Sequence, residues 1–421
     1  MESKKIVIAT IGSLGDLHPA IALALELKAR GHQVALATSA VYREKIEQTG
    51  INYHSLRPNL PINPEILEKL WHPTQGAEFF IRHLIFPALS ETYADLRDIV
   101  EGRDLLIANG IIFPASLVSE KLGIPWILYE LQPASFFSIY DPPVLETLPY
   151  LAKSRFLGVW AVNLFKQLAK LATRSWAEPI HQLRKELELP RVSHPIFFEG
   201  KFSSANLVLA MFDPVFAEPQ PDWTKQTKIT GFTFYDSQLE DRALPIQLQE
   251  FLETGEAPIV FTLGSAAVKI AGNFYTESVA AVEKLSCRAI FLVGDRKLEN
   301  LPNCAIAVDY APYSELFPHA KAVVHQGGIG TTAQALRAGV PMLVVPFSYD
   351  QPDNAARVVR LGVGRTIARK KYQRDLAVKE LQILLSDSQY KTRASEIAQI
   401  IQAENGVKTA CDAVESFFSR Y

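Results

Sequence analysis

The stretch HQGGIGTTAQALRAGVPMLVVPFSYDQPDNAARVVRLGVG, residues 325–364, decides the fold of this chain. An apolar run at 322–324 precedes it, a glycine turn follows, and a helical pattern runs over 333–338. The turn carries three glycines and two threonines, namely Gly327, Gly328, Gly330, Thr331 and Thr332. Glycine lets the backbone come close to a ligand, and the first N–H groups of a helix lack partners within it. The order strand, glycine turn, helix therefore predicts a phosphate site at a helix N-terminus.

A second polar cluster follows the next apolar strand, which we expect at 342–345. It consists of Asp350, Gln351 and Asn354. Helix capping explains one such residue but not all three, and parallel sheets bind ligands beyond the carboxyl ends of their strands. A glycine turn alone is often only a tight turn, so the second cluster carries the inference. Together the two clusters suit a diphosphate with hydroxyl-bearing groups, as in a nucleotide sugar.

The same residues resemble the signature of a known family. They read His-Gln-Gly-Gly-Ile-Gly-Thr, then Ala-Leu-x-x-Gly-Val-Pro, then Asp-Gln-x-x-Asn-Ala, over 325–355, where Gly327 or Gly328 fills the first glycine of a family pattern that is roughly His-x-Gly-x-Gly-Thr. This pattern is similar to that of the inverting glycosyltransferases of GT-B fold in the UDP-glycosyltransferase family, closest to the rhamnolipid rhamnosyltransferase and sterol glucosyltransferase branches. The resemblance implies an α/β protein with two Rossmann-like parallel-sheet domains that face a central cleft.

The apolar pattern itself divides the chain in two. Buried strands are expected at 6–10, 34–38, 105–108 and 126–129, and again at 259–263, 290–293, 322–324 and 342–345, with helices at 19–30 and 276–285. The resemblance implies that residues 1–236 bind the acceptor and 237–405 bind the nucleotide sugar, and we expect a polar linker within 213–245. The last segment, 406–421, is expected to be a helix that packs back on the first domain, as in the resembling enzymes.

The first glycine turn, Gly12 to Gly15, does not fit a dinucleotide site, because the second strand ends without a carboxylate. Gly15-Asp16-x-x-Pro19 instead matches the family element that carries the general base, and the resemblance assigns that role to Asp16. Gly15 is expected among the donor contacts. Asp16 alternatively caps the helix that follows. A carboxylate at a helix N-terminus is also a poor base unless desolvation raises its pKa, so His18 is kept as a second candidate.

The resemblance also assigns further residues to the donor site. Ser265, after the strand at 259–263, is expected to contact a phosphate, with an ordinary turn as the alternative. Ala311 and Pro312 are expected beside the base, although Tyr313 replaces the family's usual glutamine and leaves uridine or thymidine open. His325 is expected to touch a phosphate oxygen, its alternative being a satisfied histidine at a strand end. Asp350 and Gln351 are expected to hold sugar hydroxyls, whether of glucose or rhamnose.

The acceptor is predicted from a segment, 133–176, that mixes large apolar residues with lysine and arginine. Amphipathic helices over the first sheet are the simple interpretation. In the resembling enzymes this region shapes the acceptor site, so we expect a lipophilic pocket with a basic flank. Its expected lining is Phe136, Phe137, Tyr140 and Trp160.

Composition restricts the partners. Lysine plus arginine (43) nearly balances aspartate plus glutamate (45), which argues against a nucleic-acid partner. Three widely spaced cysteines form no metal motif and suit a reducing compartment. The amino-terminal segment does not resemble a signal peptide, and no apolar run approaches the ~20 residues that span a bilayer. We expect a cytoplasmic protein, with peripheral contact with the inner face of a membrane left open.

The resemblance thus implies an inverting hexosyltransferase, and we expect it to need no metal ion or other cofactor. Its co-substrate is expected to be UDP-glucose or dTDP-rhamnose, and its acceptor a hydroxyl of a lipophilic small molecule. No Asp-x-Asp triplet occurs, and a helix N-terminus can stabilise the departing diphosphate in place of a metal. A UDP-sugar 2-epimerase of the same fold and a non-catalytic nucleotide-sugar-binding protein remain as alternatives.

Overall fold

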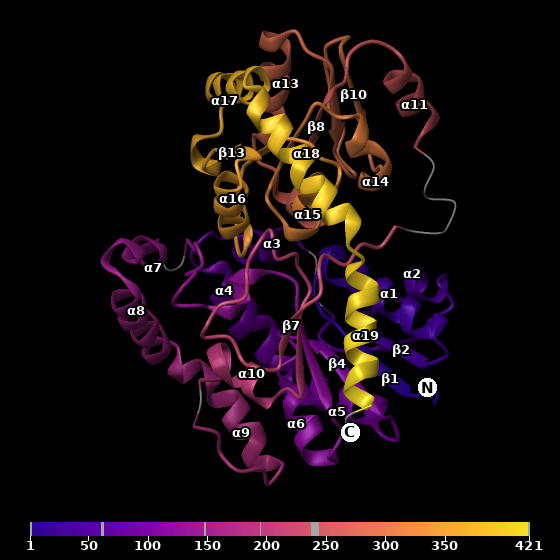
Figure 1. The fold of residues 1–421 in the computed structure, drawn as a ribbon, viewed down its shortest axis with the longest axis vertical. Coiled ribbons are helices and arrows are strands. Elements are labelled where there is room, and N and C mark those ends of the chain that lie inside the picture. The colour runs from indigo at the N-terminus through magenta and orange to yellow at the C-terminus, as the bar shows by residue number, and fades with distance from the viewer. Residues whose placement is uncertain (1, 60–62, 147–148, 194, 237–243, 420–421) are drawn as a thin grey trace. The chain divides into compact units, whose positions relative to one another are not determined.

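The computed structural model describes residues 2–59, 63–146, 149–193, 195–236 and 244–419. It comprises two compact units, each built on one parallel sheet (Figure 1). The first unit contains Met1–Leu70, Thr74–Tyr235 and Asn405–Tyr421, and the second contains Trp71–Pro73 and Asp236–Glu404.

The sheet of the first unit has seven strands in the order β3-β2-β1-β4-β5-β6-β7, and the paired strands run parallel. Its central strands are short, wholly buried apolar runs, as expected for a parallel sheet covered on both faces. The strands are β1 (Lys5–Ala9), β2 (Gln33–Thr38), β3 (Asn52–Ser55), β4 (Leu105–Asn109), β5 (Trp126–Glu130), β6 (Leu207–Ala210) and β7 (Thr227–Ile229).

The second sheet has six parallel strands in the order β10-β9-β8-β11-β12-β13. Both sheets therefore reverse their strand order once, beside β1 in the first and beside β8 in the second. These strands are β8 (Ile259–Thr262), β9 (Ala289–Leu292), β10 (Ala305–Val308), β11 (Ala322–His325), β12 (Met342–Val344) and β13 (Gly364–Thr366). The predicted α/β fold with two Rossmann-like parallel sheets is confirmed.

Helices connect the strands of each sheet. Those of the first unit are α1 (Leu14–Ala29), α2 (Arg43–Glu47), α3 (Pro64–Leu70), α4 (Gly76–Phe79), α5 (Leu89–Val100), α6 (Pro114–Leu122), α7 (Pro149–Lys153), α8 (Val159–Ala172), α9 (Glu178–Glu186), α10 (Lys201–Ser204) and α19 (Gly406–Phe418). Those of the second unit are α11 (Ile246–Glu253), α12 (Gly264–Ala267), α13 (Phe274–Leu285), α14 (Tyr313–Leu316), α15 (Ile329–Arg337), α16 (Gln351–Arg360), α17 (Arg374–Ser386) and α18 (Ser388–Ala403).

Two helices begin earlier than the sequence analysis predicts. Helix α1 begins at Leu14 rather than at residue 19, because Ser13 and Asp16 form a capping box, and Pro19 therefore lies inside the helix. Helix α15 begins at Ile329 rather than at residue 333, with Gly328 as its N-cap. Gly330 and both threonines therefore belong to the helix and not to the turn before it.

Part of the stretch predicted as a linker is a strand. Thr227–Ile229 is β7, the edge of the first sheet, where its short length and polar residues suit a strand with one neighbour. The expected domain boundary after Asp236 falls next to residues 237–243, which lie outside the described residues.

The carboxyl-terminal helix α19 packs against α1 within the first unit (Figure 1). Arg30, at the end of α1, reaches Asp412 and Glu415 of α19, each at 2.7 Å. Gly406 lies so close to the backbone of Phe232 that an added Cβ would meet its carbonyl oxygen at 2.2 Å. The last turn of the expected helix, residues 420–421, lies outside the described residues.

Candidate functional site

The point where the first sheet reverses its strand order is a polar junction. The Asn109 side chain, at the end of β4, donates to Thr10 Oγ1 at 3.1 Å and to the Ile11 carbonyl at 3.2 Å. These contacts hold the loop after β1 against β4, and this loop leads directly to Asp16. Ligands of α/β sheets bind at such reversal points, so the fold brings Asp16 to the expected edge of the sheet.

Asp16 lies in the first turn of α1 and closes back over the preceding loop. Its Oδ2 accepts from the Ser13 backbone N–H at 2.8 Å and from the Ser13 hydroxyl at 3.3 Å. Gly12, with φ of 143°, makes this possible, because a Cβ there would lie 2.2 Å from Asp16 Oδ2. The capping role considered in the sequence analysis is present, from the third helical position rather than from before the helix.

Capping does not leave the carboxyl strongly acidic. Desolvation raises the pKa of Asp16 to about 6, although the hydrogen bonds from Ser13 oppose the shift. The charge of Glu130 adds a smaller increase. A carboxylate with a pKa near 6 is mostly ionised at pH 7 and yet basic enough to accept a proton in a reaction.

His18 has the opposite shift. Desolvation, followed by the positive charge of Lys45, lowers its pKa to about 4. The ring lies 5.3 Å from that of Tyr235, and its Nε2 is buried without a hydrogen-bond partner in the described part of the chain. The order of basicity expected from isolated side chains is therefore reversed, and Asp16 is the stronger base of the two.

Two further residues near Asp16 were not predicted from the sequence, namely Tyr42 and Glu130. Tyr42 donates its hydroxyl to the Gly12 carbonyl at 3.1 Å, and burial, with the charge of Asp16, raises its pKa to about 12. Glu130, at the carboxyl end of β5, is buried and pairs with Lys201. A carboxylate directly after an apolar strand was the available signal for Glu130, whereas Tyr42 had none.

In the second unit, His325 ends β11 at the point where that sheet reverses. Its side chain is fully buried, and Nδ1 accepts from the Gly327 N–H at 3.0 Å. The proton of the neutral ring is therefore on Nε2, which is buried without a hydrogen-bond partner among the described residues. Burial lowers the pKa of His325 to about 3. The histidine is thus half satisfied, with one N–H donor unused.

Gly327 joins the two predicted clusters. Asn354 Nδ2, on α16, donates to the Gly327 carbonyl at 2.8 Å and to Asp350 Oδ2 at 2.6 Å. Gly327 has φ of 87°, and an added Cβ would meet Val344 Cγ1 at 2.8 Å. The turn after β11 is therefore clamped against β12 and α16, which explains why both motifs occur together in the sequence.

Gln351 has a structural contact that the sequence analysis did not foresee. Its Oε1 accepts from the backbone N–H groups of Phe347 at 2.8 Å and Ser348 at 3.1 Å. The oxygen therefore shapes the loop, which leaves the amide nitrogen as the group that can contact a ligand. Asp350, partly exposed, precedes α16 as its N-cap residue.

The residues in the first turn of α15, the helix predicted to bind a phosphate, differ in how exposed they are. Gly330 is exposed, and no described atom lies within 4 Å of where its Cβ would be. Thr332 is buried and donates its hydroxyl to the Gly328 carbonyl at 3.0 Å, so it supports the helix. Thr331 is also buried and hydrogen-bonds the Tyr313 hydroxyl. The open face of this turn is therefore at Gly330.

Tyr313 connects the loops that carry the remaining residues predicted to bind the donor. Its hydroxyl lies 2.8 Å from Thr262 Oγ1, at the end of β8, and its ring stacks on Phe317 with 4.4 Å between centroids. Ser265 is exposed in the short helix after β8. Ala311 is buried and Pro312 partly exposed immediately before Tyr313. The tyrosine that departs from the family pattern thus holds the loops after β8, β10 and β11 together.

The four expected acceptor residues do not form one aromatic cluster, since none of their rings contacts another among the described residues. Phe136 is buried and stacks on Trp223 at 4.2 Å, as part of the core. Phe137 contacts Phe198 at 4.9 Å. Tyr140 is 42% exposed, and Trp160, on α8, is 69% exposed.

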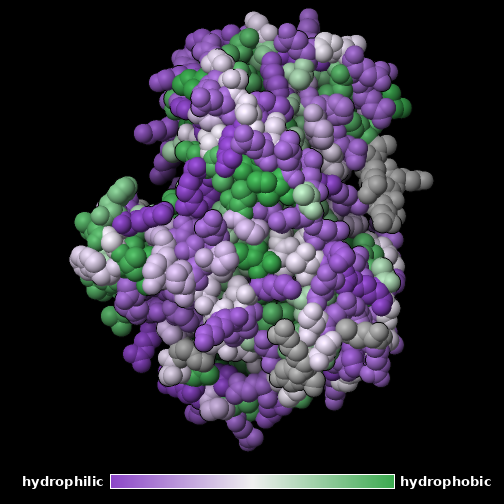
Figure 2. Space-filling view, viewed as in Figure 1, coloured by the Kyte–Doolittle hydropathy of each residue, from purple (hydrophilic) through white to green (hydrophobic). Residues whose placement is uncertain are grey.

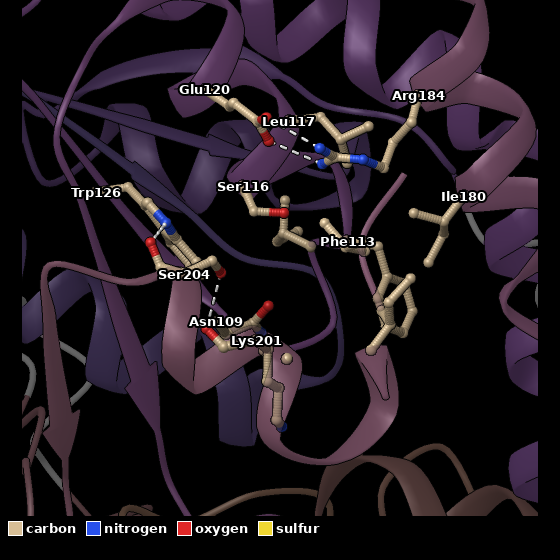
Figure 3. A pocket seen from close by; sticks show the side chains of 15 residues that line it. Asn109, Phe113, Ser116, Leu117, Glu120, Trp126, Ile180, Arg184, Lys201 and Ser204 are labelled. Carbon is tan, nitrogen blue, oxygen red and sulfur yellow. Dashed lines mark hydrogen bonds and ion pairs between the residues drawn. The ribbon is translucent and has the colours of Figure 1, made fainter. Parts of the chain in front are cut away.

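A cavity of about 140 Å³ does lie in the first unit, between α6, α9 and α10 (Figure 3). Arg184 and Glu120 pair at its wall through two bonds of 2.8 and 2.9 Å, and Asn109, Ser116 and Lys201 add further polar groups. Sites for small molecules usually enclose roughly 300–1,000 Å³. The cavity is therefore too small for a sterol-sized acceptor.

Within the described residues, no group of three or more His, Cys, Asp or Glu side chains is placed to hold a metal ion. In the same residues, no helix is long and apolar enough to cross a membrane.

Comparisons with known proteins cover both units. Residues 6–131 match the glycosyltransferase family 28 N-terminal domain, and residues 279–409 match the erythromycin biosynthesis protein CIII-like C-terminal domain. The chain is 30% identical to O-mycaminosyltylonolide 6-deoxyallosyltransferase of Streptomyces fradiae, with 98% of this chain and 97% of that protein aligned. It is 29% identical to a sterol 3-beta-glucosyltransferase of Arabidopsis thaliana, covering 98% of this chain and 65% of that one.

Among solved structures, the glycosyltransferase VinC in complex with dTDP superposes with a TM-score of 0.68. The two chains are 20% identical, and the match covers 99% of this chain and 100% of the other. At this identity the likeness concerns the fold.

Proposed function

Because the chain belongs to the UDP-glycosyltransferase family and is a glycosyltransferase, we propose that it moves a hexose from a UDP- or dTDP-sugar to a hydroxyl of a lipophilic acceptor. The proposed reaction inverts the anomeric centre and needs no metal ion. Family membership also argues against the epimerase and the non-catalytic binding protein.

The donor diphosphate is proposed to lie at the N-terminus of α15. Three features support this: the positive end of a nine-residue helix, the unused N–H of His325, and the open space at Gly330. His325 is buried, so the contact requires neighbouring atoms to move when the donor binds. Ser265, Gly328 and Thr331 are proposed at the rim, Ala311 and Pro312 beside the base, and Asp350, Gln351 and Asn354 beside the sugar.

Asp16 is proposed as the general base. The acceptor oxygen forms a bond with the anomeric carbon while its proton passes to Asp16, and the bond from that carbon to the diphosphate breaks on the opposite face. Both contacts from Ser13 go to Oδ2, so Oδ1 is the proposed proton acceptor. The raised pKa of Asp16 is the single observation that carries this assignment, since helix capping alone does not require it.

The acceptor is proposed to be lipophilic because the relatives aligned over nearly the whole of this chain are named for a macrolide and for sterols. The sugar is proposed to be glucose or a 6-deoxyhexose such as rhamnose. VinC binds dTDP, and the family also uses UDP, so both nucleotides must be tested.

Calorimetric titration with UDP, dTDP, UDP-glucose and dTDP-rhamnose, in the presence of a chelator, tests the donor half. We expect one nucleotide family to bind tightly without metal. A panel of sterols, macrolide aglycones and hydroxy fatty acids then tests the acceptor, with the anomeric configuration of the product read by NMR. Failure of every nucleotide to bind, or a strict need for magnesium or manganese, would contradict the proposal.

A further inference from the structure

Helix α8 exposes its large apolar residues to solvent, whereas a helix that only covers a sheet would bury them. Its buried positions are Ala161, Val162, Lys166 and Ala169. Its exposed positions include Trp160, Leu164, Leu168 and Leu171, spaced as one stripe along the helix. Helices that cover a core bury their large residues and expose their polar ones, so the pattern of α8 is inverted.

The exposed stripe continues beyond the helix. Phe156 is 95% exposed and Leu157 is 63% exposed in the turn before α8, and Tyr150 of α7 is 66% exposed. We call these residues and the stripe of α8 the apolar face. Figure 2 shows hydrophobic surface gathered over α7 and α8. Contiguous exposed patches of this kind mark interaction sites on soluble proteins.

The segment that carries the apolar face has only basic charged side chains. Residues 150–177 contain five basic and no acidic side chains. Three of the five pair with acidic residues outside the segment: Lys166 and Lys170 with Glu199 at 3.1 and 2.8 Å, and Arg155 with Asp141 at 3.9 Å. Lys153 and Arg174 are exposed beside the face. A basic rim around an apolar stripe is the pattern of helices that lie in the interface of anionic membranes.

We propose that the apolar face docks the protein on a bilayer that contains anionic lipids. A second copy of the chain is a poorer occupant, because a two-fold contact through this face would bring like charges together. Helix α8, 14 residues long, would lie in the plane of the interface with Trp160 at the headgroup level. The inference rests on this surface and not on the proposed reaction.

Flotation of the full chain with vesicles tests the docking. We compare phosphatidylcholine alone with a mixture that contains phosphatidylglycerol, and we expect binding to the mixture that weakens as salt rises. The double variant Leu164→Ser, Leu168→Ser is expected to lower partitioning by about tenfold or more, and Lys153→Gln with Arg174→Gln by a smaller factor. Ile246→Ser, at a 75% exposed site on α11, is the matched control and is expected to bind as the wild type does.

Trp160 supplies an independent reading. Its emission is expected to shift to shorter wavelength on the mixed vesicles, and Trp160→Phe is expected to remove the shift while it keeps an apolar ring for binding. The proposal is overturned if the wild type does not float with the mixed vesicles, or if the Leu164→Ser, Leu168→Ser variant floats as well as the wild type. It is also overturned if light scattering finds a wild-type dimer that the leucine variant no longer forms. Nucleotide titration is scored separately, so its failure would contradict the proposed function and leave the docking result standing.

Discussion

Asp16 and His18 lie two residues apart on one helix, yet their surroundings shift their pKa values in ways that exchange their roles. Burial raises the pKa of the carboxyl to about 6 and lowers that of the imidazole to about 4, because it disfavours the charged form of each. If Asp16 is the base, the rate constant kcat/KM should rise with pH to a plateau, with its midpoint near 6. A pH profile with a saturating donor measures this, and a midpoint unchanged in Asp16→Asn would contradict the assignment.

Asp16→Asn should lower kcat by about 10²–10⁴-fold, because the amide cannot accept the proton. His18→Asn should leave the midpoint near 6 in place. If the pH profile of kcat/KM has a second inflection that disappears in the His18 variant, the histidine shares the proton transfer.

Asp16 should also reduce the stability of the fold at neutral pH. Its pKa in the folded chain lies above the unfolded value, so the protonated form is favoured by folding. That contribution is full below about pH 4 and is lost as pH rises through 6. Asp16→Asn, which keeps an oxygen for Ser13, should therefore be more stable than the wild type at pH 8 by about 1–3 kcal/mol. Urea unfolding at pH 4 and pH 8 measures the difference, which should shrink at the lower pH.

Helix α15 is the element on which the donor proposal depends. At Gly330 neither φ nor packing demands glycine, so alanine should stabilise the helix by about 0.5–1 kcal/mol. If the diphosphate lies over this turn, the same methyl group should weaken nucleotide binding by about tenfold or more. Thermal unfolding and calorimetry of Gly330→Ala measure both effects.

Gly327→Ala, in the turn that precedes α15, is the informative comparison. Its φ of 87° and the 2.8 Å approach to Val344 predict lost stability, and any loss of binding there follows from misfolding of the turn. Unchanged nucleotide affinity in Gly330→Ala would move the diphosphate away from the first turn of α15.

At the scale of the whole molecule, the first unit is completed by the last helix of the chain. Arg30 joins α1 to Asp412 and Glu415 across more than 380 residues of sequence. Arg30→Gln should weaken this contact by about 1 kcal/mol, because the pairs are partly exposed. Cys411 is buried on α19, so a thiol reagent can label it only when α19 separates from the first unit. In a Cys287→Ser, Cys304→Ser background, Arg30→Gln should accelerate the labelling of Cys411 about fivefold. An equal rate in both proteins would show that Arg30 does not hold α19.

Local patterns by themselves predicted the two parallel sheets and the polar cluster at 325–354, because apolar runs, glycine turns and strand-end polar residues are short-range signals. Asp16 was singled out by the family resemblance. Only the tertiary structure decided which of these groups are chemically available. Burial reversed the basicities of Asp16 and His18, Gln351 turned its oxygen to the backbone, and Phe136 entered the core. The strand at Thr227–Ile229 and the apolar face of α8 were decided in the same way, because solvation and pairing depend on neighbours that are distant in the sequence.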